Sequence, residues 1–233
     1  MKALSGRYFS NSDLHLVRMM HDYGFLSYDE EPIVLNSGIN TRFYVGGRHD
    51  VTDHPDFEWS LGSKMASLIY QHARKEHDTK TQCLIGVPTG GTVIAQATAM
   101  VGAKANRHKG FCHRIMRESL KKHGKGKTWV SGKPEPVLHT YWLVDNTMTT
   151  GKSILRAIRR LKKDGYPVAN LRIMVAVDRQ QGGMEALKAA GYHRVVSAFN
   201  LSDLAYVSQQ LHCWTTSVVQ ALKVELQQPL LAA

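Results

Sequence analysis

The chain has 233 residues, of which 43% are hydrophobic, and a formal net charge of +11. This length suits one large α/β domain and is too short for two full-sized domains with linkers. The sequence has no apolar run near the roughly 18 residues of a membrane span and no apolar signal-peptide core at its start, so we expect a cytoplasmic protein. Cys83, Cys112 and Cys213 are odd in number and widely spaced, which favours reduced packing residues over a disulfide framework or a zinc site.

The positive charge indicates an anionic partner. Lysines and arginines concentrate between Lys104 and Lys133, where glycines are interspersed and apolar residues are few. This composition is typical of a solvated loop, not of a packed helix face. Either nucleic acid or a small polyphosphate would be attracted, and charge alone does not choose between them.

The hydrophobic pattern predicts an N-terminal helix from Asn11 to Tyr23, stopped by Gly24, and then two short strands at 33–35 and 42–45. Strands and helices alternate after that. The expected helices are 55–77, 91–100, 152–164, 182–190 and 214–224, and the expected strands are 83–87, 110–115, 138–144, 171–177 and 194–199. The continuously apolar stretches 141–144 and 171–177 indicate a parallel sheet covered by helices on both faces.

A strand-to-helix segment at residues 139–153 carries the most chemical information. An apolar strand leads into Asp145, and a turn of small residues then opens a helix. The helix start offers unpaired backbone N–H groups to a phosphate, Gly151 permits close approach, and the hydroxyl donors would be Thr149, Thr150 and Ser153. An ordinary turn, with Asp145 as a helix N-terminal acid, is the plainer alternative. A nucleotide-binding P-loop is rejected because it requires glycine where Asn146 stands.

This segment resembles the ribosyl-pyrophosphate signature of the type I phosphoribosyltransferases. Four more segments resemble the orotate phosphoribosyltransferases in their order and approximate spacing: residues 35–44, 85–95, 117–124 and 177–183. The resemblance runs from about Leu14 to Leu204. It implies an α/β fold with a central, mostly parallel sheet flanked by helices and a small N-terminal hood. We therefore expect one domain over 1–233, with the hood in about 1–50 and the core and C-terminal helix in about 51–233.

The resemblance also implies an activity. The 5-phosphoribosyl group of 5-phosphoribosyl 1-pyrophosphate (PRPP) would be transferred to orotate, giving orotidine 5-phosphate and pyrophosphate in pyrimidine nucleotide synthesis. The implied catalytic residues are Lys121, His123, Arg117 and Asp145. The implied substrate-binding residues are Asn146, Thr147, Thr149, Thr150, Gly151, Lys152 and Ser153 for the ribose phosphate, Thr89, Gly90 and Gly91 for the pyrophosphate, Arg179 for the orotate carboxylate, and Asn36, Ser37, Gly38, Phe43 and Tyr44 near the base.

Further partners follow from the same resemblance. Magnesium is implied, held mainly by PRPP oxygens and water and not by a cage of protein ligands. A homodimer is also implied, in which the loop of residues 117–124 reaches into the neighbouring site.

Three departures from the family pattern keep alternatives open. Asn36 and Glu118 stand where lysines are usual, and Asn146 stands where a second acid is usual. The alternatives are phosphoribosyl transfer to another base, or a catalytically weak PRPP-sensing or nucleic-acid-binding protein on the same fold. Nucleic acid is less favoured, because the residues before Asn36 are too few for an additional winged-helix module.

Overall fold

The computed structural model describes residues 1–35, 37–46, 52–105, 110–119, 129–130 and 132–227. Its central feature is a five-stranded sheet in the order β4-β3-β5-β6-β7, in which every neighbouring pair is parallel. The strands are β3 (Thr81–Gly86), β4 (Phe111–Ile115), β5 (His139–Met148), β6 (Arg172–Asp178) and β7 (Val195–Asn200). The predicted parallel sheet is thereby confirmed.

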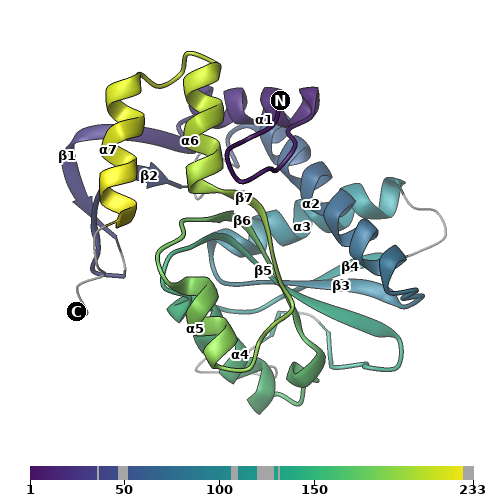
Figure 1. Ribbon diagram of the computed structural model, residues 1–233. Coiled ribbons are helices and arrows are strands. Elements are labelled where there is room, and N and C mark those ends of the chain that lie inside the picture. Colours follow the sequence, from purple (N-terminus) through teal and green to yellow (C-terminus); the bar gives the residue numbers. More distant parts are fainter. Residues whose placement is uncertain (36, 47–51, 106–109, 120–128, 131, 228–233) are drawn as a thin grey trace.

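Helices cover both faces of this sheet (Figure 1). One face carries α1 (Asn11–Asp22), α2 (Pro55–Lys75) and α3 (Gly90–Ala105), and the other carries α4 (Lys152–Lys163) and α5 (Gly183–Ala189). The chain is completed by a short 3₁₀ turn (Val168–Asn170), α6 (Leu201–Gln210) and α7 (Thr216–Gln227). Within the described residues, no helix combines the length and apolarity needed to cross a membrane.

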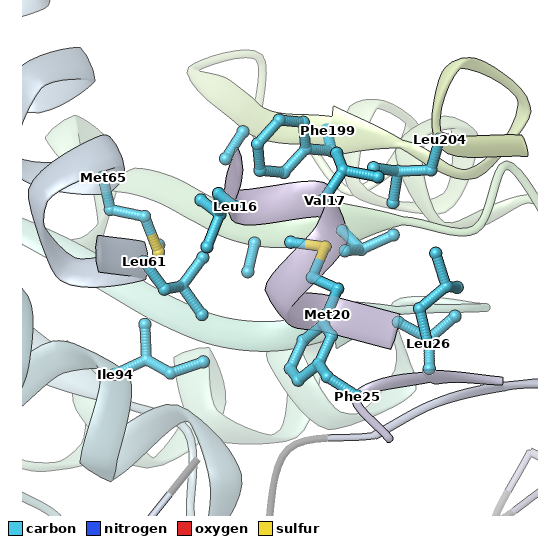
Figure 2. Close-up of a cluster of buried hydrophobic side chains, with 14 of the residues drawn as sticks. Leu16, Val17, Met20, Phe25, Leu26, Leu61, Met65, Ile94, Phe199 and Leu204 are labelled. Atoms are coloured by element: carbon cyan, nitrogen blue, oxygen red, sulfur yellow. The ribbon is translucent and has the colours of Figure 1, made fainter. Parts of the chain in front are cut away.

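Alternation along the strands explains the two hydrophobic cores. On β5, Trp142 and Val144 point into the core under α2 and α3, whereas Tyr141 and Leu143 point into the core under α4. Figure 2 shows part of the first core, where Leu16, Leu61 and Phe199 come together from α1, α2 and β7. Because both faces are buried, the central stretches of β5 (141–144) and β6 (173–177) are apolar without interruption.

A second, antiparallel sheet of two strands forms the hood, with β1 (Leu26–Val34) paired to β2 (Asn40–Val45). The C-terminal α7 lies beside this hairpin in Figure 1, and the Trp214 ring just before it lies 5.4 Å from that of Phe43. The sequence pattern predicts the first strand only at 33–35. The structure starts it at Leu26; the exposed acidic stretch at 29–31 hides the strand from a search for alternating apolar residues.

The sequence pattern predicts no element between Phe199 and Trp214, where the structure has α6. The helix buries Leu201, Leu204 and Val207, a helical spacing. It follows β7 directly, without a turn segment between them. The prediction relied on turn residues to separate one element from the next. It therefore missed α6, because the strand changes to a helix at Asn200 without an intervening turn.

A network of charged side chains lies at the amino ends of β5 and β6. Arg172 is buried; its guanidinium donates to Asp78 Oδ2 at 2.7 Å and to Glu76 Oε2 at 2.6 Å. Thr140 Oγ1 also donates to Asp78 Oδ2, at 2.7 Å. Burial raises the pKa of Asp78, but the hydrogen bonds from Thr140 and Arg172 outweigh it and lower the pKa from 3.8 to about 2.

This network gives a pH-dependent prediction for Asp78→Asn. We expect the variant to lose about 2 kcal/mol of unfolding free energy at neutral pH, because a charged acceptor of several hydrogen bonds is removed. The folded pKa lies below the ordinary value, so the carboxylate's contribution is complete above 3.8 and is lost as the pH falls toward about 2. Urea unfolding across this range measures it. A difference from the parent chain that is independent of pH would contradict the prediction.

The start of α3 lies against β5 so closely that glycine is required at one position. A Cβ on Gly91 would lie 2.3 Å from the backbone oxygen of Val144, whereas one on Gly90 would meet the Asn146 side-chain amide at 2.9 Å. A side-chain amide can rotate away, but the backbone of a central strand cannot. Gly91 therefore allows α3 to approach β5 this closely.

We expect Gly91→Ala to destabilise the fold by about 1–3 kcal/mol, because α3 must move off β5. Gly90→Ala is the matched control, since both changes bring a similar gain in helix propensity. Denaturant unfolding of the two variants provides the comparison. Equal stability of the two would show that the contact at Val144 is not limiting.

Candidate active site

A cleft of about 350 Å³ opens at the carboxyl ends of β3 and β5, bordered by the start of α4 and by the hood. Ligands of open parallel sheets bind at this edge. The predicted site residues that line the cleft are Ser37, Tyr44, Thr89, Gly90, Asp145, Asn146, Thr147, Thr149, Thr150, Gly151, Lys152, Ser153 and Arg179. Segments far apart in the sequence thus meet in one place.

Some predicted residues do not line the cleft. Gly38, Gly91 and Arg117 are outside its lining, and Gly91 has the packing role described above. Asn36, Lys121 and His123 lie outside the described residues.

The expectation that Phe43 lies near the base requires correction. Its ring is only 1% exposed and packs against Tyr28 and Trp214, with ring centres 5.1 and 5.4 Å away. Neighbouring residues of a strand point to opposite faces. Only Tyr44 of the aromatic pair therefore reaches the cleft.

Asp145 is held on a strand and not on a loop. The sequence pattern predicts that this strand ends at Val144, but β5 continues to Met148, with Asp145 paired to Val175 and Thr147 to Val177. The carboxylate is 5% exposed; Oδ1 accepts from the Asn146 N–H at 3.0 Å and Oδ2 accepts from Ser153 Oγ at 3.1 Å. Strand pairing and hydrogen bonds together fix its orientation.

The turn after β5 presents a helix N-terminus to the same cleft. Gly151, the N-cap of α4, has φ of 74°, a left-handed conformation that favours glycine. No side chain among the described residues caps the helix. The N–H groups of the first turn, with the hydroxyls of Thr149 and Thr150, therefore form a site suited to a phosphate dianion.

The hood is attached to the end of β5. Asn146 Nδ2 donates to the Gly46 carbonyl at 3.2 Å, and Thr147 Oγ1 donates to the Val45 carbonyl at 3.4 Å. The end of β2 thereby forms one wall of the cleft.

Arg179 lines the cleft but is also a structural link. The guanidinium is 1% exposed and donates to Gln181 Oε1 at 2.9 Å, the Phe43 carbonyl at 2.8 Å and Thr41 Oγ1 at 3.0 Å, with Glu225 Oε1 at 3.7 Å. Burial lowers the pKa of Arg179 to about 10, and Glu225 offsets part of this effect. The group is therefore cationic at neutral pH. Its role toward a substrate carboxylate stays a prediction.

Two charged residues of the cleft were not assigned to the site from the sequence. Glu118 Oε2 accepts from Thr89 Oγ1 at 3.1 Å, so the carboxylate faces the predicted pyrophosphate turn. Arg156 follows Lys152 by four residues on α4, and this spacing puts both on one helix face. The i, i+4 spacing was the signal that could have identified Arg156.

Comparisons with known proteins show which family this chain resembles. No family model matches the chain. It is 31% identical over 186 residues to the orotate phosphoribosyltransferase of Nostoc sp., covering 80% of this chain and 83% of the relative. It is 32% identical over 174 residues to that of Pyrobaculum aerophilum, covering 73% and 78%.

Among solved structures, the orotate phosphoribosyltransferase of Mycobacterium tuberculosis matches with a TM-score of 0.60 at 22% identity, covering 83% of this chain and 98% of that one. The M. tuberculosis enzyme has also been solved in complex with PRPP. At this identity the structural match shows the shared fold. The identity to the curated relatives, which extends over most of the sequence, shows that this chain belongs to the orotate phosphoribosyltransferase family.

Proposed function

We propose that this enzyme transfers the 5-phosphoribosyl group of PRPP to orotate, forming orotidine 5-phosphate and pyrophosphate in pyrimidine nucleotide synthesis. One observation carries the proposal. The uncapped N-terminus of α4 and the carboxylate of Asp145 open into the same cleft, joined by the Ser153 hydrogen bond. A phosphate bound at the helix start would place the attached ribose toward Asp145.

The chemistry of the transfer requires charge separation. As the bond to pyrophosphate breaks, positive charge develops on the ribose ring and negative charge on the leaving group. A fixed carboxylate at Asp145 stabilises the developing cation more than the neutral ground state. Because Ser153 and the Asn146 N–H already orient this carboxylate, little reorganisation is needed during the reaction.

The leaving pyrophosphate is proposed to lie between β3 and α3, beside Thr89 and Gly90. Glu118 hydrogen-bonds to Thr89 in this structure, so a pyrophosphate oxygen taking that donor would replace the carboxylate. Arg117 begins the segment proposed to neutralise the leaving group, with Lys121 and His123 following it outside the described residues. Orotate is proposed to bind on the hood side, between Tyr44 and Arg179.

Magnesium is proposed as the cofactor, held mainly by PRPP oxygens and water. Within the described residues, the cleft is lined by carboxylate, amide and hydroxyl oxygens and by no imidazole or thiol, a donor set that fits this ion. Asp145 and Asn146 would provide protein oxygens near it, and the bound ion would neutralise part of the pyrophosphate charge. We further propose a cytoplasmic homodimer in which the loop of residues 117–124 crosses to the neighbouring site.

The function is tested by mixing the purified chain with orotate, PRPP and magnesium, and following orotate consumption and orotidine 5-phosphate formation. We expect activity in the parent chain and a loss of about 100-fold or more in kcat for Asp145→Asn, since a charge facing the transition state is removed. Asp22→Asn, which changes an exposed acid at the end of α1, should retain full activity.

The outcomes separate the parts of this proposal. PRPP binding in calorimetry without orotate consumption would shift the assignment to another acceptor base. Absence of PRPP binding in a folded chain would refute the proposal as a whole.

A row of cations on α4 gives a kinetic prediction. Lys152, Arg156, Arg159 and Lys163 recur at helical spacing and are exposed, and no ion pair joins them to other described residues. The first two line the cleft, and the last two extend beyond it. Such a row raises the local concentration of a polyanionic substrate.

We expect the double change Arg159→Gln and Lys163→Gln to lower kcat/KM for PRPP about 3–10-fold at low ionic strength, because this charge steers the approach of PRPP. The value of kcat should not change, and the effect should shrink as salt is added. Arg74→Gln with Lys75→Gln removes the same charge from α2, on the other face of the sheet, and is the control. Equal loss in both double variants would exclude steering by α4.

A further inference from the structure

Two free cysteines lie directly opposite each other on neighbouring strands. Cys83 of β3 pairs in register with Cys112 of β4. Neighbouring strands are about 4.8 Å apart. This spacing falls within the roughly 4.4–6.8 Å between Cα atoms that a disulfide spans. Because the residues are paired in parallel strands, their side chains leave the sheet on the same side, toward the core under α4. The register and the Cα spacing of the two residues are therefore compatible with a disulfide.

The two thiols differ in their access to solvent. Cys83 is fully buried in the sheet, whereas Cys112 lies on the edge strand and is half-buried. A small oxidant would meet Cys112 first. Cys83 lies behind it, within reach of the sulfur that has reacted.

The surroundings of the pair favour a thiolate at Cys112. Hydrogen bonding from Cys83 lowers the pKa of Cys112, although burial opposes this, and the same interaction together with burial raises the pKa of Cys83. The Arg114 guanidinium also interacts with Cys83 and lowers the pKa of Cys112. Glu135 accepts from Arg114 Nη2 at 2.8 Å, while Arg114 Nη1 is buried without a hydrogen-bond partner in the part of the chain described.

We propose that Cys83 and Cys112 form a reversible dithiol–disulfide pair, in which Cys112 is the attacking thiol and Cys83 the resolving thiol. With hydrogen peroxide as oxidant, the Cys112 thiolate attacks one oxygen, the O–O bond breaks, and a sulfenic acid and hydroxide form. Cys83 then attacks this sulfur, the S–O bond breaks, and its thiol proton leaves with the hydroxide as water. In total, two thiols are oxidised and one peroxide is reduced to two waters.

The position of the pair gives the cross-link a structural consequence. β4 is the edge strand of the sheet, and five residues after Cys112 the chain reaches Arg117, where the proposed pyrophosphate loop begins. A disulfide would fasten this strand to β3. The oxidation itself is independent of the proposed transfer reaction.

The experiment treats the reduced, full-length chain with hydrogen peroxide and analyses it by intact mass and peptide mapping. We expect a loss of two hydrogen atoms, a peptide linking Cys83 to Cys112, and full reversal by dithiothreitol. Cys213→Ser, which removes the remaining thiol, should behave like the parent chain. Cys83→Ser should stop at a sulfenic acid on Cys112 that dimedone labels, and Cys112→Ser should leave Cys83 unreacted.

Cys83→Ser places a hydroxyl at a buried position and is expected to lower stability. Dimedone added early in the oxidation of the parent chain therefore identifies, in the native fold, which cysteine first forms the sulfenic acid. Labelling at Cys112 supports the assigned order, and labelling at Cys83 overturns it. Absence of the linked peptide from the oxidised parent chain overturns the proposal.

Discussion

The parallel alignment of β3, β5 and β6 is the constraint on which the candidate site depends. It brings the carboxyl ends of the three strands to one edge, so that the turn at Thr89, the acid at Asp145 and the guanidinium of Arg179 meet in a single cleft. β5 extends far enough to keep Asp145 within the sheet, paired to Val175. The candidate ribose-side carboxylate is therefore held on the central strand of the sheet.

The hood depends on a second, local interaction. Buried Arg179 joins the end of β6 to β2 through the Phe43 carbonyl and Thr41, and α7 adds Glu225 to the same group. A buried cation without such partners would be strongly unfavourable. Replacing Arg179 would therefore disturb the hood as well as the proposed orotate site, and a loss of activity at this position would not by itself identify a substrate contact.

The sequence predicted those parts of the structure that depend on local pattern. Continuous apolar runs predicted β5 and β6, and the turn at 149–151 predicted the start of α4, because helix termini and glycine act locally. Parts fixed by tertiary contact were missed or misplaced. The ring of Phe43 packs into the core against Trp214 and does not face the cleft. The side chain of Glu118 is oriented by a hydrogen bond from Thr89, a residue distant in sequence.

The charge of the side chains differs along the cleft. Lys152 and Arg156 stand beside the helix N-terminus, whereas the carboxylates of Asp145 and Glu118 lie toward the proposed sites of ribose and pyrophosphate. If pyrophosphate binds at Thr89 as proposed, PRPP would have to break the hydrogen bond between Thr89 and Glu118, which would weaken the ground-state complex. The same bond would reform when pyrophosphate leaves. An acid where the family usually has a lysine would thus lower the affinity for substrate and for the leaving product together, and its effect on turnover would depend on which of the two steps is slower.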